Sequence, residues 1–131
     1  MSRAAALDAY LHSVAERHFD WRHWNCCHFV AGWAVQRTGI DPMQGLPSTA
    51  SQRSAHRLIR TLGGTLAEAW SRRLGAEALP ATLAQPGDVV LVQDGDLRAV
   101  GLCLGHRAAV LSPQGLAYTG MAAAVHAWRL P

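Results

Sequence analysis

The chain has 131 residues, of which half are hydrophobic and 16% are charged, and its formal net charge is +3. This composition excludes a disordered chain and predicts one globular domain with a single core. All 12 basic residues are arginine and they are spread along the sequence, so there is no basic stripe of the kind that nucleic-acid-binding proteins carry. No run approaches the roughly 20 apolar residues that a membrane span needs. Neither nucleic acid nor a membrane span is therefore predicted.

The first half of the chain has the apolar spacing of helices. Residues 2–18 repeat apolar side chains every three or four positions, which predicts an amphipathic helix. A second helix is predicted between Asn25, a favourable N-cap, and Gly39, a favourable C-cap. A third is predicted over about 48–62, and a fourth begins after Thr65.

From about residue 86 the pattern changes to that of β-strands separated by turns. Apolar runs between turn residues predict strands at 87–93, 97–105, 106–112 and 115–120, with 124–130 as a candidate for the last. Helices first and strands second indicate the α+β class, with N-terminal helices packed on a small antiparallel sheet of four to six strands. We expect a single domain over 1–131, with a helical part over about 1–78 and a β part over about 86–131.

Cys26 lies one residue after the predicted N-cap, in the first turn of a helix. Free backbone N–H groups and the positive end of the helix dipole stabilise a thiolate there and lower the pKa of a cysteine. A cysteine peptidase needs this arrangement, a histidine that exchanges the proton, and a third polar group that orients the histidine. Small buried cysteines also pack well at helix starts, so the position alone leaves a structural role open. Because the three cysteines include one adjacent pair, no disulfide framework is predicted, and the chain suits a reducing cell interior.

Four motifs follow one another in an order and spacing that are specific only when taken together. They are the aromatic lead-in "WRHW" (21–24), "NCCHFV" (25–30), "PGDVVLV" (86–92) and "AVGLCLG" (99–105). Over about residues 21–112 the chain resembles the NlpC-type cell-wall peptidases, a papain-like superfamily. It resembles more closely a small branch found among phage and prophage tail genes, which also shares the "AWR" ending (127–129). The resemblance implies a papain-like NlpC-type fold.

Carried over residue by residue, Cys26 matches the nucleophile position of that superfamily. The resemblance places the catalytic histidine directly before "VGLCLG", where this chain has Ala99, and the third polar residue near Leu111, which is apolar. The neighbouring Ser112 would point to the opposite face of its strand. Loss of a general acid–base typically costs on the order of 10² to 10⁴ in rate. The resemblance therefore implies a pseudoenzyme with a relict nucleophile position.

The remaining histidines and cysteines leave two chemical alternatives. His23, in the lead-in loop, could fold back and substitute as the base, whereas His28 follows Cys26 by two residues and points about 200° away from it. His56 lies on a predicted polar helix face, where a solvated side chain is the default. Cys103 is expected on the strand face that looks toward the Cys26 helix, but adjacent cysteines do not match the spacing of structural zinc ligands. Neither a metal nor a cofactor is predicted.

The five tryptophans are large apolar anchors, and most of them are expected in the core. Trp21 and Trp24 flank Arg22 and His23 in the lead-in loop. Because tryptophan and arginine are enriched at interfaces, Trp21, Arg22 and Trp24 are the predicted partner-binding residues.

The resemblance implies a catalytically degenerate domain that serves as a structural or assembly component of a phage or prophage-derived tail, at the tail tip. Its partners would be other tail-tip or hub proteins, and its location the virion after synthesis in the bacterial host cytoplasm. The alternative is an active cysteine peptidase or amidase that cleaves peptidoglycan peptides with Cys26 as nucleophile. A toxin or immunity-type domain of the same fold is a third reading.

Overall fold

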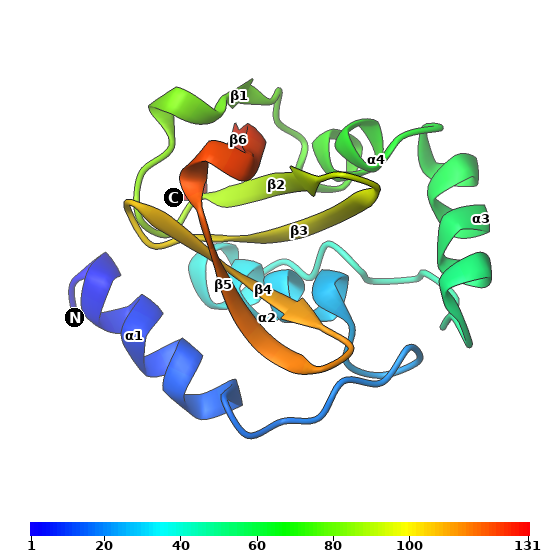
Figure 1. The fold of residues 1–131 in the computed structure, drawn as a ribbon, viewed down its shortest axis with the longest axis horizontal. Coiled ribbons are helices and arrows are strands. Elements are labelled where there is room, and N and C mark those ends of the chain that lie inside the picture. The colour runs from blue at the N-terminus through cyan, green and yellow to red at the C-terminus, as the bar shows by residue number, and fades with distance from the viewer.

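The structure is a computed structural model that describes residues 1–131 apart from the side chain of Leu97. Four helices come first in the chain: α1 (Arg3–Val14), α2 (Cys26–Thr38), α3 (Gln52–Leu62) and α4 (Leu66–Leu74). The strands follow: β1 (Leu79–Pro80), β2 (Val89–Asp94), β3 (Leu97–Cys103), β4 (Arg107–Ser112), β5 (Gly115–Gly120) and β6 (Ala124–Trp128). Two short 3-10 helices, η1 (Ala81–Leu83) and η2 (Met121–Ala123), precede β2 and β6. The predicted α+β class is confirmed (Figure 1).

The ends of the helices are set by capping side chains and glycines. The Asn25 side chain accepts the backbone N–H groups of Cys27 and His28, and Gly39 ends α2 with a φ of 77°. The predicted third helix is shorter than expected, because Ser51 caps it and α3 begins only at Gln52. None of the helices in the described chain combines the length and apolar character that crossing a bilayer requires.

The six strands form one antiparallel sheet in the order β1-β6-β2-β3-β4-β5. The last strand therefore lies inside the sheet, between β1 and β2, and a register shift interrupts its pairing with β2 between Leu91 and Val92. β1 was not predicted, because it consists of two residues that pair only with β6 and one of them is proline.

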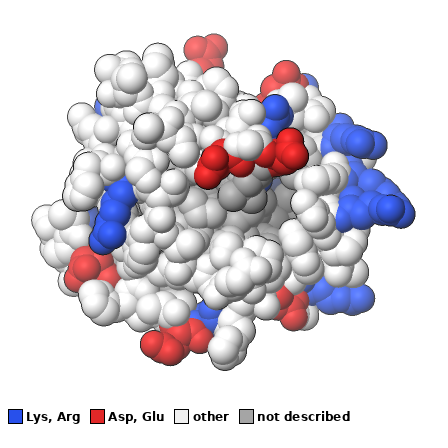
Figure 2. All heavy atoms as spheres, in the orientation of Figure 1, with Lys and Arg blue, Asp and Glu red and all other residues white. Residues whose placement is uncertain are grey.

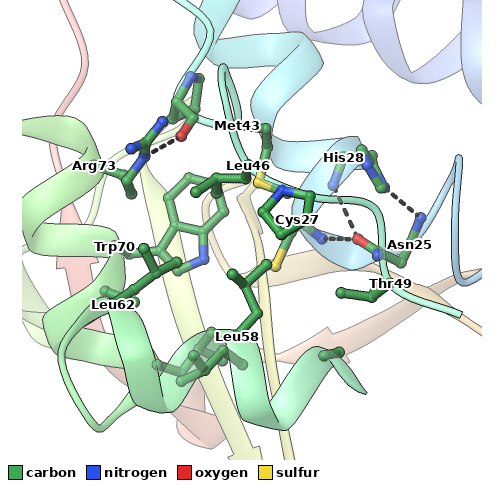
Figure 3. Close-up of a pocket in the computed structure, with 16 residues that line it drawn as sticks. Asn25, Cys27, His28, Met43, Leu46, Thr49, Leu58, Leu62, Trp70 and Arg73 are labelled. Carbon is green, nitrogen blue, oxygen red and sulfur yellow. Dashed lines mark hydrogen bonds between the residues drawn. The ribbon is translucent and has the colours of Figure 1, made fainter. Parts of the chain in front are cut away.

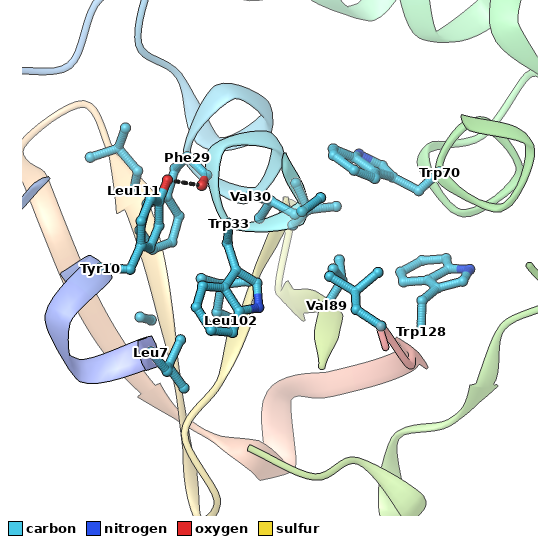
Figure 4. Close-up of a cluster of buried hydrophobic side chains, with 14 of the residues drawn as sticks. Leu7, Tyr10, Phe29, Val30, Trp33, Trp70, Val89, Leu102, Leu111 and Trp128 are labelled. Carbon is cyan, nitrogen blue, oxygen red and sulfur yellow. Dashed lines mark hydrogen bonds between the residues drawn. The ribbon is translucent and has the colours of Figure 1, made fainter. Parts of the chain in front are cut away.

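One face of the sheet packs against α1, α2 and α4 and forms the main core (Figure 4). Trp33 and Trp128 are fully buried in it. The Trp33 indole N–H donates to the Gly87 carbonyl at 2.9 Å, and that of Trp128 donates to the Ser71 hydroxyl at 2.9 Å. These two hydrogen bonds satisfy polar groups that would otherwise be costly to bury, and they fix how α2 and α4 sit on the sheet.

The opposite face carries smaller side chains, and three parts of the chain pack against it: Ala84 after η1, the crossover from β5 to β6, and Cys26 at the start of α2. Cys103 lies on this face, whereas Val100 and Leu102 of the same strand belong to the core around α2. The prediction that Cys103 lies on the strand face toward α2 was therefore wrong. Its neighbours Val100 and Leu102 lie on that face, and Cys103 lies on the other. This face is closely packed, since a Cβ on Gly101 would overlap the carbonyl oxygen of Ala109.

Candidate functional site

The adjacent cysteines lie in the first turn of α2, which a reciprocal hydrogen-bond pair holds in place. The Asn25 side chain caps the helix, and the Asn25 backbone N–H donates to Nδ1 of His28 at 3.2 Å. This capping box rigidifies the turn in which Cys26 and Cys27 stand. Both cysteines are partly exposed as residues, and neither is in a disulfide.

Cys26 lines a cavity of about 180 Å³ between the start of α2, α3 and the sheet. Ala99 of β3 and Leu111 of β4 line the same cavity. The three positions that the resemblance assigns to nucleophile, base and third polar residue therefore share one cavity. Ser112, at the end of β4, also lines it, and its hydroxyl donates to the Gly115 carbonyl at 2.9 Å.

Cys27 and His28 line a second, smaller cavity of about 50 Å³ between α2, α3, α4 and the loop that precedes α3. Figure 3 shows Cys27 facing Trp70 of α4 and Leu58 of α3. His28 belongs to this second cavity and not to the one that Cys26 lines, as its position on the helix predicts. Burial lowers the pKa of His28, so its neutral form, which can accept the capping hydrogen bond, is favoured.

The two thiols differ in acidity. A hydrogen bond from the Cys27 side chain lowers the pKa of Cys26; burial opposes this shift, and the backbone N–H of Val100 supports it. The same interaction, together with burial, raises the pKa of Cys27 well above its ordinary value. Cys26 is therefore the more acidic of the two thiols.

His23, the predicted substitute base, does not supply a base to this cavity. His23 is exposed and lies in a tight turn in which Asp20 Oδ1 accepts its backbone N–H at 3.0 Å, and it does not line the Cys26 cavity. His56 of α3 is the one histidine among the described residues that does line it. The sequence placed His56 on a polar helix face, and the side chain is indeed exposed. What the sequence could not provide was the position of α3 beside the cavity.

The two lead-in tryptophans have different environments. Trp21 is half-buried, packs edge-on against Phe19 with ring centroids 4.9 Å apart, and lines the Cys26 cavity with it. Trp24 is 6% exposed and belongs to the main core, with the Arg17 guanidinium 3.9 Å from its ring centroid. Trp24 was predicted as a partner-binding residue, but its ring is buried in the main core and is not exposed at the surface. Of the three predicted residues, Trp21 and the exposed Arg22 remain accessible.

No group of three or more metal-ligating side chains gathers among the described residues. Cys103 is fully buried on the far face of the sheet, where its Sγ accepts the Gly105 N–H at 3.3 Å. It therefore does not join Cys26 and Cys27 in a ligand set.

Two of the motifs that carry the resemblance meet in a buried ion cluster. Asp88 of "PGD" is fully buried and accepts the Gln85 backbone N–H at 2.8 Å and Arg129 Nη2 at 3.2 Å. Nη1 of Arg3 lies 3.7 Å from the same carboxylate. None of these residues lines the Cys26 cavity. The role of Asp88 and of the "AWR" arginine is therefore to fasten β2, β6 and α1 together.

A comparison with proteins of curated description gives no match to this chain. A family model does match, and the match extends over residues 2–130. It thus includes the caps of α2, the Cys26 cavity and the Asp88 cluster. The chain belongs to this family, which is described as a domain of unknown function (DUF6950).

Proposed function

We propose that this protein is a catalytically degenerate NlpC-like domain that serves as a structural or assembly component of a phage or prophage-derived tail, at the tail tip. The observation that carries the proposal is the composition of one cavity, which Cys26, Ala99 and Leu111 all line. In the peptidases that the sequence resembles, these positions hold a nucleophile, a histidine and a polar residue. Here the first is kept and the other two are apolar, so the cavity offers a binding surface without the base.

The chemistry of the cysteine pair supports loss of the reaction. Attack of a thiolate on an amide carbonyl breaks the C–N bond only when a proton reaches the leaving amine. Cys27 is the proton donor beside Cys26, but its raised pKa makes it a poor acid at neutral pH. Neither Ala99 nor Leu111 can carry a proton.

A second candidate is an active cysteine hydrolase of peptidoglycan peptides. Two observations favour it: the pKa of Cys26 is lowered, and His56 lines the same cavity. In this case Cys26 attacks the carbonyl, and His56, in place of the predicted His23, delivers the proton to the leaving amine.

Alkylation of Cys26 by iodoacetamide as a function of pH distinguishes the two candidates. For the degenerate domain we expect His56→Gln to leave the alkylation profile unchanged and purified peptidoglycan to release no fragments. His106→Gln is the matched control, because His106 is exposed in the β3–β4 turn and does not line the cavity. Fragment release that disappears in both Cys26→Ser and His56→Gln, but not in His106→Gln, would establish the hydrolase.

The tail assignment is tested on particles. Mass spectrometry of purified virions or induced prophage particles is expected to find the chain in the tail fraction, after its synthesis in the host cytoplasm. Deleting its reading frame is expected to leave tails that are incomplete at the tip. Particles that lack the protein and still have complete, infective tails would refute this role.

A further inference from the structure

The outward face of α3 carries three arginines and a histidine close together. Arg53, Arg57 and Arg60 recur at helical spacing with His56 between them, and all four are exposed. The helix contains no acidic residue, and no carboxylate among the described side chains lies within 4 Å of these groups. Figure 2 shows arginine side chains gathered on the side of the molecule where α3 lies in Figure 1.

This basic face is continuous with the Cys26 cavity. Gln52 and His56 line both the hollow between the α3 arginines and the cavity itself. Arg98 of β3, which is also exposed, lines the cavity from the sheet side. Arg98 therefore borders the cavity directly and the α3 arginines lie next to it, while Ala99 and Leu111 make part of its lining apolar.

The size and lining of the cavity suit one large apolar side chain. Its volume of about 180 Å³ is comparable to the roughly 150 Å³ of an engineered apolar cavity that binds benzene. Phe19 and Trp21 provide aromatic surface on one wall. An occupant that fills the apolar cavity and also pairs with the arginines beside it carries an apolar side chain flanked by negative charges.

We propose that the Cys26 cavity and the basic face of α3 form one docking site for an acidic segment of a partner protein, which inserts an apolar side chain beside Cys26. The proposal rests on the proposed function, because it treats the cavity as a binding surface. It favours a protein over a bilayer, because the apolar face of α3 (Ala55, Leu58 and Ile59) is turned inward and lines the two cavities. It favours a protein over nucleic acid, because phosphates would engage the arginines but leave the apolar cavity unfilled.

The test uses the full chain and a blocked heptapeptide with a central phenylalanine and three acidic residues on each side. Binding is followed by amide NMR shifts at low salt, where attraction between exposed charges is least screened. We expect shifts at Ala99 and Leu111 as well as along α3. Replacing the peptide's phenylalanine by alanine should weaken binding about tenfold.

Charge-reversal variants of the protein distinguish binding at the docking site from nonspecific electrostatic attraction between the peptide and any arginine. Arg57→Glu should weaken binding of the peptide about fivefold, whereas Arg107→Glu on β4, the matched control, should change it less than about twofold. Equal effects of the two variants, or no shifts at the cavity at millimolar peptide, would overturn the proposal. So would tighter binding of a single-stranded oligonucleotide or of vesicles containing phosphatidylglycerol, with shifts confined to the arginines.

The outcome is separable from that of the tail assignment. Peptide binding by a protein absent from particles would keep the docking site and refute the tail role. A protein that is present in particles but does not bind the peptide would refute the docking site and keep the tail role.

Discussion

Gly32→Ala is expected to destabilise the protein, although an alanine in the interior of a helix ordinarily stabilises it. Gly32 lies in the middle of α2, where alanine is favoured over glycine by about 1 kcal/mol. A Cβ at this position would overlap the Tyr10 hydroxyl oxygen and lie 3.2 and 3.3 Å from two ring carbons. Tyr10 is 5% exposed, donates its hydroxyl to the Phe29 carbonyl, and packs with its ring centroid 5.9 Å from those of both Phe29 and Trp33. The ring cannot move away without losing these interactions.

The magnitude follows from the competing terms. Loss of the buried hydrogen bond costs about 1–1.5 kcal/mol, and overpacking of the ring adds about 1–3 kcal/mol. After the gain of about 1 kcal/mol in helix propensity, a net loss of about 1–3 kcal/mol in the free energy of unfolding remains. Urea unfolding followed by tryptophan fluorescence measures it, and the melting temperature should fall by roughly 3–5 °C per kcal/mol.

A double-mutant cycle identifies the cause. Tyr10→Phe removes the oxygen that the new methyl group would overlap, so Gly32→Ala should cost about 1 kcal/mol less in that background than in the wild type. Gly120→Ala is the control: no atom lies within 4 Å of a Cβ there, and its stability change should stay within about 0.5 kcal/mol. A Gly32→Ala variant as stable as the wild type, or more stable, would refute the placement of Tyr10 against α2.

Three further predictions concern ionisable groups. Cys27→Ala should move the alkylation profile of Cys26 to higher pH, since the Cys27 hydrogen bond is the largest cause of the lowered pKa of Cys26. Cys27→Ser, which keeps a hydrogen-bond donor, should move the profile less. Equal shifts in the two variants would contradict this cause. Burial lowers the pKa of His28 from 6.5, so the stability that neutral His28 contributes is complete above about pH 6.5 and is lost as the pH falls through the folded-state value. In urea unfolding between pH 5 and 7, His28→Gln, which retains an acceptor for the capping box, should show a flatter dependence than the wild type; an unchanged slope would argue against this origin. Asp88→Ala should lower the free energy of unfolding by about 2–3 kcal/mol in the same assay. This is below the ~3–5 kcal/mol for breaking a fully buried ion pair, because both partner arginines are partly exposed. A loss below about 1 kcal/mol would show that the cluster is dispensable for stability.

Much of the fold was predictable because its boundaries depend on local chemistry. Asn25, Gly39 and Thr65 cap helices through their own side chains or backbone conformations, and such signals are readable from neighbouring residues. β1 was not predictable in this way. Its two residues are a strand only because β6, more than 40 positions later, pairs with them.

The candidate site divides along the same line. The Asn25 cap placed Cys26 at a helix start, and the resemblance paired it with Ala99, which lines the same cavity. The location of α3 beside that cavity depends on tertiary packing and had no local signal, so His56 was missed. The spacing of Arg53, Arg57 and Arg60 by four and three residues could have revealed one basic helix face, although the arginines are scattered over the chain as a whole.

The place of β6 inside the sheet sets an order of events during folding. Until β6 arrives, β2 is an edge strand with four successive buried apolar residues, and β1 has no partner at all. Unpaired apolar edges of this kind recruit other chains, so partly folded molecules should aggregate before the sheet closes. Translation must pass residue 128 before that edge can be covered. A truncation within β6 is therefore expected to disrupt the pairing of β1 and β2 as well as β6 itself. The truncated chain should aggregate and collect in inclusion bodies.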